Sequence, residues 1–189
     1  MYCQTLIIGF TLGLGSNRLF NMRAQQKLFS RFSKDMNPGL LTWIGVRPAR
    51  FEPLNILASV RAIEGKGLEG DHRCGKTPGS SRQVTVISRE FISQIEVFLK
   101  REIPPGLLRR NLVVEGLNLN ALRHQQFQIG SAIFEATALC HPCNRMEKTL
   151  GKGAVVAMLG HGGLCAKVIQ TGCIALNDSI TVLSPDEYR

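Results

Sequence analysis

The sequence has no apolar run long enough to cross a bilayer as a helix. The apolar stretch from Leu6 to Leu14 has nine residues, whereas a membrane-spanning helix needs about 20. The chain also has no internal repeat, no low-complexity segment and no GxGxxG fingerprint after a strand-like run. We therefore expect no transmembrane segment, and the pattern disfavours a doubly wound nucleotide-binding fold.

Cysteines and acidic residues are both scarce. Six cysteines in 189 residues are too few for a disulfide scaffold, and only Cys140 and Cys143 are closely spaced. We therefore expect reduced thiols and a cytoplasmic location. Fourteen acidic residues against 23 basic ones give a net charge of +9, which suits a small anionic ligand as well as a nucleic acid. No basic run is interleaved with aromatic residues, so nucleic acid is not the favoured partner.

The first 36 residues differ in composition from the rest of the chain. They hold five basic residues and one acid, and the segment from Asn17 to Met36 has loosely helical apolar spacing. This composition resembles an organelle presequence, but we favour a different interpretation. Residues 1–36 are interpreted as a basic extension that is disordered or precedes the true start at Met36. One domain is then expected over residues 37–184, with residues 185–189 as a tail.

Short β-like runs separated by turns dominate that domain. Alternating β-branched residues predict a strand over Arg82 to Ser88, and a hairpin is predicted to turn at Gly130–Ser131. Ser88 is the expected N-cap of a helix that ends at Pro104–Gly106. A second helical segment is expected over Cys143 to Leu150. The sequence thus predicts a mainly β (α+β) fold, namely a compact β-barrel with a few peripheral helices.

Five stretches, in order, resemble the MOSC domain, the module shared with the C-terminal part of molybdenum-cofactor sulfurases. They are GKGLEGDHRCG (Gly65 to Gly75), RQVTVIS, LLRRNLVVEGLNLNAL (Leu107 to Leu122), FQIGSAIFEATALCHPC and GLCAKVIQTGCIALNDSITV (Gly163 to Val182). Each stretch alone is a weak indication of the family, but the five together cover the length of one domain. The resemblance implies a MOSC-type β-barrel with one reactive cysteine in a pocket.

The resemblance also implies a function. In relatives that bind molybdenum cofactor a cysteine ligates the metal, and Cys143 sits at the matching position, with Cys140 as a possible second thiol. Some relatives detoxify N-hydroxylated bases and others reduce amidoximes, so the implied substrate is a small N-hydroxylated molecule. The sequence has no flavin, haem or iron–sulfur motif, so an external electron-donating reductase is expected. The sulfurases carry pyridoxal phosphate on a different domain.

Several residues are candidates for this chemistry. A reactive cysteine acts as a thiolate, and Arg145, Lys148 and the start of the second helix would favour ionisation of Cys143. The forked guanidinium groups of Arg109 and Arg110 suit a cofactor phosphate. The remaining cofactor-binding candidates are Asn111, Arg82, Asp71, His72, and the backbone of Gly162 and Gly163.

Other interpretations of the two cysteines remain open. The lack of a second C-x-x-C disfavours structural zinc, and the lack of a βαβ context disfavours a thioredoxin-type pair. Two inert buried thiols are a serious alternative. Two other functions are also consistent with the sequence. One is a sulfur carrier with a persulfide on Cys143, supplied by a sulfur donor, and the other is a non-catalytic module that binds an anion.

Overall fold

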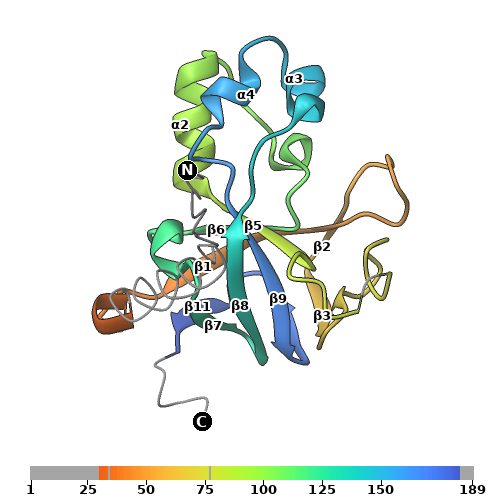
Figure 1. The fold of residues 1–189 in the computed structure, drawn as a ribbon, viewed down its shortest axis with the longest axis vertical. Helices are drawn as coiled ribbons and strands as arrows, with labels where there is room; N and C mark the ends of the chain where they lie inside the picture. The colour runs from red at the N-terminus through yellow and green to blue at the C-terminus, as the bar shows by residue number, and fades with distance from the viewer. Residues whose placement is uncertain (1–29, 34, 77, 184–189) are drawn as a thin grey trace, which may run out of the picture.

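The computed structural model describes residues 30–33, 35–76 and 78–183. Most of the expected extension (1–36) and the whole tail (185–189) lie outside the described residues. The main sheet is a closed ring of seven strands with an eighth strand at its side (Figure 1). Around the ring the strands are β11 (Ser179–Val182), β7 (Gln126–Ile129), β8 (Ala132–Leu139), β9 (Leu164–Gln170), β5 (Val84–Ser88), β6 (Leu112–Glu115) and β1 (Gly39–Val46).

The ring closes where the first strand meets the last. Gly39 of β1 pairs with Ile180 of β11, and Ile180 also pairs with Ile129 of β7. A Cβ atom on Gly39 would lie 2.1 Å from the side chain of Leu117, so only glycine fits at this position. All pairings around the ring are antiparallel except that of β5 with β6. The result is a mixed β-barrel.

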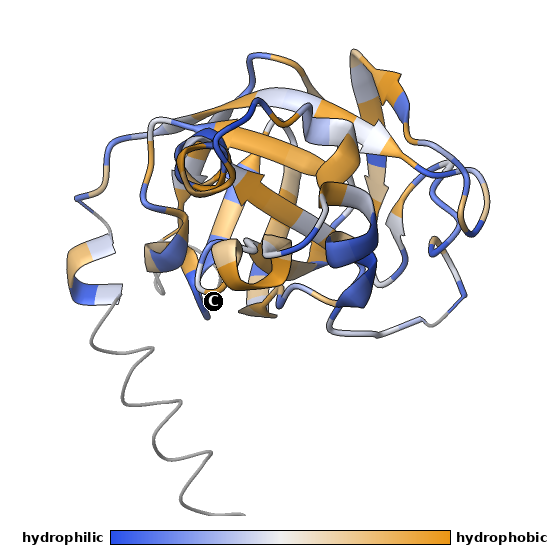
Figure 2. Cartoon of the chain, turned by 90° about the horizontal axis from the view of Figure 1, so that it is seen from above, coloured by the Kyte–Doolittle hydropathy of each residue, from blue (hydrophilic) through white to orange (hydrophobic). Residues whose placement is uncertain are grey.

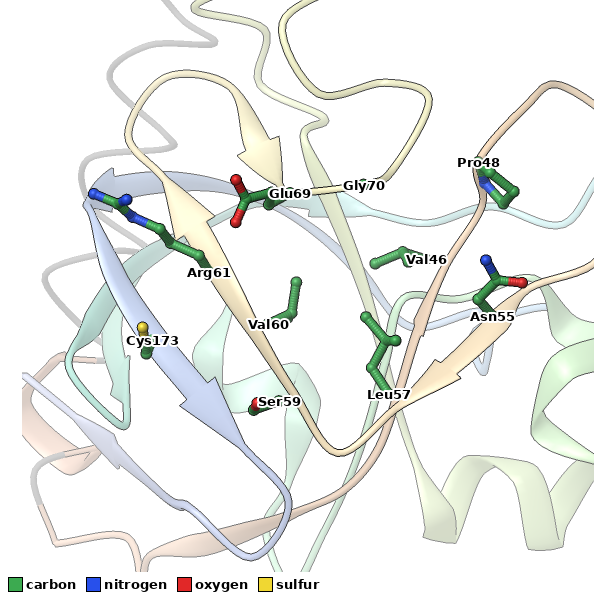
Figure 3. A pocket seen from close by; sticks show the side chains of 10 residues that line it. All are labelled: Val46, Pro48, Asn55, Leu57, Ser59, Val60, Arg61, Glu69, Gly70 and Cys173. Atoms are coloured by element: carbon green, nitrogen blue, oxygen red, sulfur yellow. The ribbon is translucent and has the colours of Figure 1, made fainter.

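Four short strands lie beside the barrel. β2 (Asn55–Leu57) pairs with β1, and β3 (Ser59–Ile63) joins β4 (Gly67–Leu68) and β10 (Gly172–Ala175) in a separate sheet. Together with β1, these strands surround the cavity of Figure 3.

The barrel interior is filled by alternating apolar side chains. On β7 and β8, every second residue is buried, and the rings of Phe127 and Phe134 stack with their centroids 5.5 Å apart. Figure 2 shows that the strands are mostly hydrophobic and the connecting loops more hydrophilic. This pattern explains why the strands form a closed sheet, since closure buries one face of every strand.

Three helices gather at one end of the barrel (Figure 1). α2 (Arg89–Leu99) follows β5 directly, and its N-cap Ser88 accepts a hydrogen bond from the backbone of Phe91. α3 (Asn144–Leu150) and α4 (Ala154–Ala157) follow β8. Their apolar sides form a second core cluster, separate from the one inside the barrel. Among the described residues, no helix is long and apolar enough to span a membrane.

The predicted fold is confirmed: a mainly β barrel with a few short helices. The hairpin turns at Gly130–Ser131 as expected, since Ile129 pairs with Ala132. One boundary was wrong. The first helix does not run to Pro104, because Lys100 adopts a left-handed conformation and caps it after Leu99.

A substitution at Ile180 tests how much ring closure contributes to stability. Ile180 is 2% exposed at the closure, whereas Ile56 on β2 is 69% exposed. We expect Ile180→Ala to lower the free energy of unfolding by about 2–5 kcal/mol, because it leaves a cavity between β11 and its two partners. Ile56→Ala should change it by less than about 0.5 kcal/mol. Urea denaturation measures both values, and equal effects would contradict the closure argument.

Candidate functional site

The two closely spaced cysteines lie where the chain leaves the barrel. β8 ends at Leu139 and α3 begins at Asn144, so Cys140 and Cys143 lie in the short connection between them. A cavity of about 250 Å³ opens beside this connection. Its lining comes from the end of β1, the loop before β5, the start of β6, β9 and α3, so residues distant in sequence meet here. The lining residues are Arg47, Arg73, Arg82, Thr85, Arg109, Arg110, Cys140, His141, Cys143, Arg145, Met146 and Cys165.

Six of these twelve residues are arginines, which makes the cavity strongly positive. Arg47 and Arg110 are buried, at 5% and 7% exposure. Burial lowers the pKa of Arg47, and the nearby charge of Arg109 lowers it further, although Asp71 opposes both effects. Burial and then Arg145 likewise lower the pKa of Arg109. The fold thus holds mutually repelling cations together, an arrangement that an anion would relieve.

The arginines also have unused hydrogen-bond donors. Arg110 donates through Nε to the carbonyl of Gly162 at 2.8 Å, but its buried Nη2 has no partner. Nε of Arg47 and both Nε and Nη2 of Arg109 are buried without partners as well. Within the described part of the chain, none of the six cavity arginines forms a salt bridge with a carboxylate. Buried unpaired donors are costly, so this cavity is suited to a ligand rich in acceptors.

A buried polar network supports the arginines from behind. One carboxylate oxygen of Asp71 accepts hydrogen bonds from the backbone of Arg47 at 3.1 Å and from the side chain of Asn111 at 2.9 Å. The other accepts from the backbone of Arg73 at 2.9 Å and lies 3.3 Å from Nδ1 of His72. Asp71 thereby connects the end of β1 to the loop that carries Arg73.

Asn111 completes this network on the side of the barrel. Its amide nitrogen also donates to the carbonyl of Gly45 at 3.1 Å. Its amide oxygen accepts from the backbone and the hydroxyl of Thr85, at 3.1 and 2.8 Å. Every hydrogen-bonding position of this amide is therefore used inside the protein. Asn111 does not face the cavity but fixes the strand start that carries Arg110.

Gly162 and Gly163 are required for close backbone packing. A Cβ atom on Gly162 would lie 2.1 Å from the carbonyl oxygen of Cys140, and one on Gly163 would lie 2.1 Å from that of Val86. Neither glycine lines the arginine cavity. Their observed contribution is to bring β9 close to the cysteine segment and to present the carbonyl that orients Arg110.

Cys140 and Cys165 form a pair at the cavity. Cys140 is half-buried, Cys165 is 2% exposed, and both thiols are free. A hydrogen bond from the Cys165 thiol lowers the pKa of Cys140 to about 6; burial opposes this shift, and Arg110 and Arg82 add to it. The same hydrogen bond raises the pKa of Cys165, as does its burial. The two shifts have opposite directions, so Cys140 is the more acidic thiol of the pair.

Cys143 has different surroundings. It is exposed, lines the same cavity, and is the N-cap residue of α3, as expected for a helix that begins after it. Arg145, two residues later, packs its guanidinium group over the ring of Phe51 at 5.0 Å from the centroid. This contact helps to hold Arg145 in the cavity lining, where it can meet a ligand bound at Cys143.

A second, larger cavity has less suitable chemistry (Figure 3). It measures about 550 Å³ and is lined mainly by apolar side chains from β1, β2 and β3. Its charged residues are one cation, Arg61, and one anion, Glu69. Because its charges balance and it lacks the close thiol pair, we regard the arginine cavity as the candidate site.

The structure brings together some of the predicted site residues. Cys140, Cys143, Arg82, Arg109, Arg110 and Arg145 line the cavity, whereas Asp71, His72, Asn111, Gly162 and Gly163 do not. The sequence analysis did not identify Arg47, Thr85 or Cys165 as site residues, although all three line the cavity. Arg47 and Thr85 carried a weak signal, because each lies in or directly after a strand whose neighbours are apolar.

Comparison with known proteins gives one family match. A family model described as the MOSC domain matches residues 69–181. This range contains the loop after β4, all three cavity cysteines and five of the six cavity arginines. A search of curated proteins gives no significant match.

Solved structures share the fold at low sequence identity. The YuaD protein from Bacillus subtilis has a TM-score of 0.69 at 18% identity, covering 79% of this chain and 97% of that chain. YiiM from Geobacillus stearothermophilus has a TM-score of 0.63 at 18% identity, covering 77% and 75%. YiiM from Escherichia coli has a TM-score of 0.59 at 18% identity, covering 77% and 70%.

The buried network can be tested through Asn111. We expect Asn111→Ala to lower the free energy of unfolding by about 2–3 kcal/mol, because it leaves buried partners such as Asp71 with unmade hydrogen bonds. Asn37 is exposed, and Asn37→Ala should have almost no effect. Urea denaturation measures both. An Asn111 variant as stable as the Asn37 control would show that the network does not support the cavity.

The Cys140 thiolate can be tested by its reaction with iodoacetamide. Because its pKa is lowered to about 6, alkylation of Cys140 should rise steeply around pH 6 and level off near neutral pH, unlike that of an ordinary thiol. Cys165→Ala should shift this profile to higher pH, since the hydrogen-bond donor is lost. Cys165→Ser keeps a donor and should shift it less. Peptide mass spectrometry gives the rates, and identical profiles in all three proteins would contradict the assignment.

Proposed function

Since this chain belongs to the MOSC domain family, we propose that it binds molybdenum cofactor in the arginine cavity and reduces small N-hydroxylated compounds. Base analogues and amidoximes are the proposed substrate class. The observation that carries the proposal is the joint presence of an exposed thiol and buried, unpaired guanidinium groups around one cavity. A metal with a sulfur ligand and a phosphate tail needs both of these groups.

The residues present fit the proposed cofactor. Molybdenum takes soft sulfur ligands, and Cys143 offers an accessible sulfur atom at the cavity. The cofactor is anionic through its phosphate, and the unpaired donors on Arg47, Arg109 and Arg110 are of the type that binds phosphate oxygens. The ligand would therefore satisfy buried donors that otherwise have no partner.

Most of the predicted site residues then have a defined role. Cys143 ligates the metal, Arg109 and Arg110 bind the phosphate, and Arg145 and Arg82 contribute positive charge around the bound group. Asp71 and Asn111 act indirectly, because they position the segments that carry the arginines. Gly162 acts through its carbonyl, which orients Arg110.

When bound, the cofactor supplies the two-electron redox chemistry that the protein side chains lack. Reduction of an N-hydroxyl group to the amine consumes two electrons and two protons and releases water. His141 lines the cavity and is exposed, so its imidazole can carry protons between solvent and the substrate oxygen. The electrons come from a separate reductase, because the chain has no redox motif of its own.

Metal analysis of the full chain tests this proposal. After expression in a host that makes molybdenum cofactor, we expect the wild-type protein to retain molybdenum and pterin. Cys143→Ser should reduce the molybdenum content by about tenfold or more, because the metal loses its protein thiolate. Cys173→Ser is the matched control, since Cys173 is exposed on β10 away from this cavity, and it should retain the metal. Elemental analysis and pterin fluorescence give the readout.

Activity completes the test. The loaded wild-type protein should reduce an amidoxime with a chemical or protein electron donor, and the Cys143 variant should not. If the wild-type protein contains no molybdenum and cannot be distinguished from the Cys143 variant, the proposal is wrong. If the Cys143 variant binds anions normally while Arg110→Ala abolishes salt-sensitive binding, the cavity belongs instead to a non-catalytic anion-binding module.

A sulfur-carrier function is a second candidate, and one observation favours it. Cys140 is a second thiol at the same cavity and its pKa is lowered, so a persulfide on Cys143 would have a nearby sulfur able to accept its outer sulfur atom. Such a protein would release thiocyanate on treatment with cyanide and contain no molybdenum. The elemental analysis above therefore separates the two functions.

A further inference from the structure

We propose that Cys140 and Cys165 form a thiol–disulfide exchange site for small anionic disulfides, in which Cys140 attacks and Cys165 closes an internal disulfide. The site is separate in its chemistry from the proposed metal ligand, because it uses neither Cys143 nor a bound cofactor. Through this exchange site, the cysteines of the arginine cavity could be oxidised, in addition to any ligand that the cavity binds.

The sheet register places the two cysteines on the same face. In the β8–β9 pair, Ala138 is opposite Cys165 and Leu139 is opposite Leu164. The register continues by one residue, since the backbone of Cys140 donates to the carbonyl of Gly163 at 2.7 Å. Side chains two residues apart point to the same side of a strand, so Cys140 and Cys165 are diagonal neighbours facing the cavity.

A disulfide between them needs only a small local movement. Diagonal neighbours in a sheet are about 7–8 Å apart at Cα, close to the upper limit of about 7 Å for a disulfide. Cys140 directly follows the last residue of β8, and its N–H keeps one hydrogen bond across the pair, to the carbonyl of Gly163. Both side chains also line the same cavity.

The two cysteines differ in access, which assigns their order of reaction. Cys140 is half-buried at the cavity, so a disulfide from solvent can reach its sulfur. Cys165 is 2% exposed, so a reagent in solvent cannot attack it directly, whereas Cys140 can. Cys140 is therefore the attacking thiol and Cys165 the resolving thiol.

The reaction balances with the disulfide as the oxidant. The Cys140 thiolate attacks one sulfur of the small disulfide, whose sulfur–sulfur bond breaks, and the first small thiolate leaves. Cys165 then loses its proton to solvent and attacks the sulfur of Cys140. The mixed disulfide bond breaks and the second small thiolate leaves. Two protein thiols are oxidised to one disulfide, and one small disulfide is reduced to two thiols.

The first step prepares the second. The pKa of Cys165 is raised by its hydrogen bond to the Cys140 thiolate, by burial, and by the negative charge of Cys140. Conversion of Cys140 to a mixed disulfide removes its thiolate. The hydrogen bond and the negative charge of Cys140 then no longer raise the pKa of Cys165, and only burial still does. Arg82 and Arg110 continue to favour the Cys165 thiolate. Cys165 thus becomes easier to ionise only after Cys140 has reacted.

The charge of the cavity selects the class of disulfide. Arg73 and Arg82 are exposed at the cavity, and Arg110 is buried within it. These three guanidinium groups attract a disulfide that carries carboxylates and favour the thiolate that it meets. A neutral disulfide of similar size has no such attraction.

Oxidised glutathione, a dianionic disulfide, is a suitable probe for the full-length reduced protein. Intact mass and peptide mapping should show a Cys140–Cys165 disulfide in the wild-type protein, with the loss of two hydrogen atoms, and reversal by dithiothreitol. Cys165→Ser should stop at one glutathione on Cys140. Cys140→Ser should leave Cys165 unmodified. Cys143→Ser should still form the internal disulfide.

Acid quenching of the wild-type reaction gives a second measurement that needs no variant. Glutathione should appear on Cys140 first and decline as the internal disulfide forms. Glutathione on Cys143 with Cys140 left free, or a Cys140–Cys143 disulfide as the main product, would overturn the proposal. Either result would leave the metal analysis of the proposed function unaffected, so the two failures are distinguishable.

The selectivity for anions is tested with bis(2-hydroxyethyl) disulfide, which is neutral. At low salt the anionic probe should react about tenfold faster, and the difference should shrink at high salt. The double variant Arg73→Gln/Arg82→Gln should reduce this preference, and Arg61→Gln, which lines the other cavity, should not. Equal rates for both probes in the wild-type protein would refute the anionic class.

Discussion

Repulsion among arginines confined to one small cavity is the constraint on which the site depends. Six guanidinium groups line about 250 Å³, and two of them are buried. Such crowding opposes folding unless the segments that carry the charges are held firmly, because each chain segment would otherwise turn its arginine toward water. The barrel supplies rigid strand ends, and the carboxylate of Asp71 supplies the one nearby opposite charge that acts on Arg47.

The polar network and the thiol pair are two responses to this positive charge. Asp71 and Asn111 tie together the end of β1, the loop after β4, and the starts of β5 and β6. The same positive charge acts on the thiol pair, because Arg110 and Arg82 help to lower the pKa of Cys140. The cavity therefore combines accessible sulfur with fixed cations, which is a chemical environment that neither the strands nor the helices would create alone.

The many short strand-like runs with closely spaced turns were sufficient to predict a β-barrel, although β5 is buried at every position and so does not alternate. The hairpin at Gly130–Ser131 could also be predicted from its turn residues. The proximity of Cys140 to Cys165 could not be predicted, because it depends on the register between β8 and β9 and on a bulge near Ala136. Pattern reasoning treats residues far apart in sequence independently. It thus found Arg145 beside the cysteine motif but missed Arg47, which directly follows β1.

The pairing of β1 with β11 has a consequence for how the chain folds. Gly39 and Ile180 lie near opposite ends of the described residues, yet their contact completes the barrel. Bringing such distant segments together has a high entropic cost, and proteins rich in such contacts fold slowly. Before closure, β1 and β11 each present a free edge that can pair with another molecule. A nascent chain would therefore be exposed to aggregation until its last strand has been synthesised.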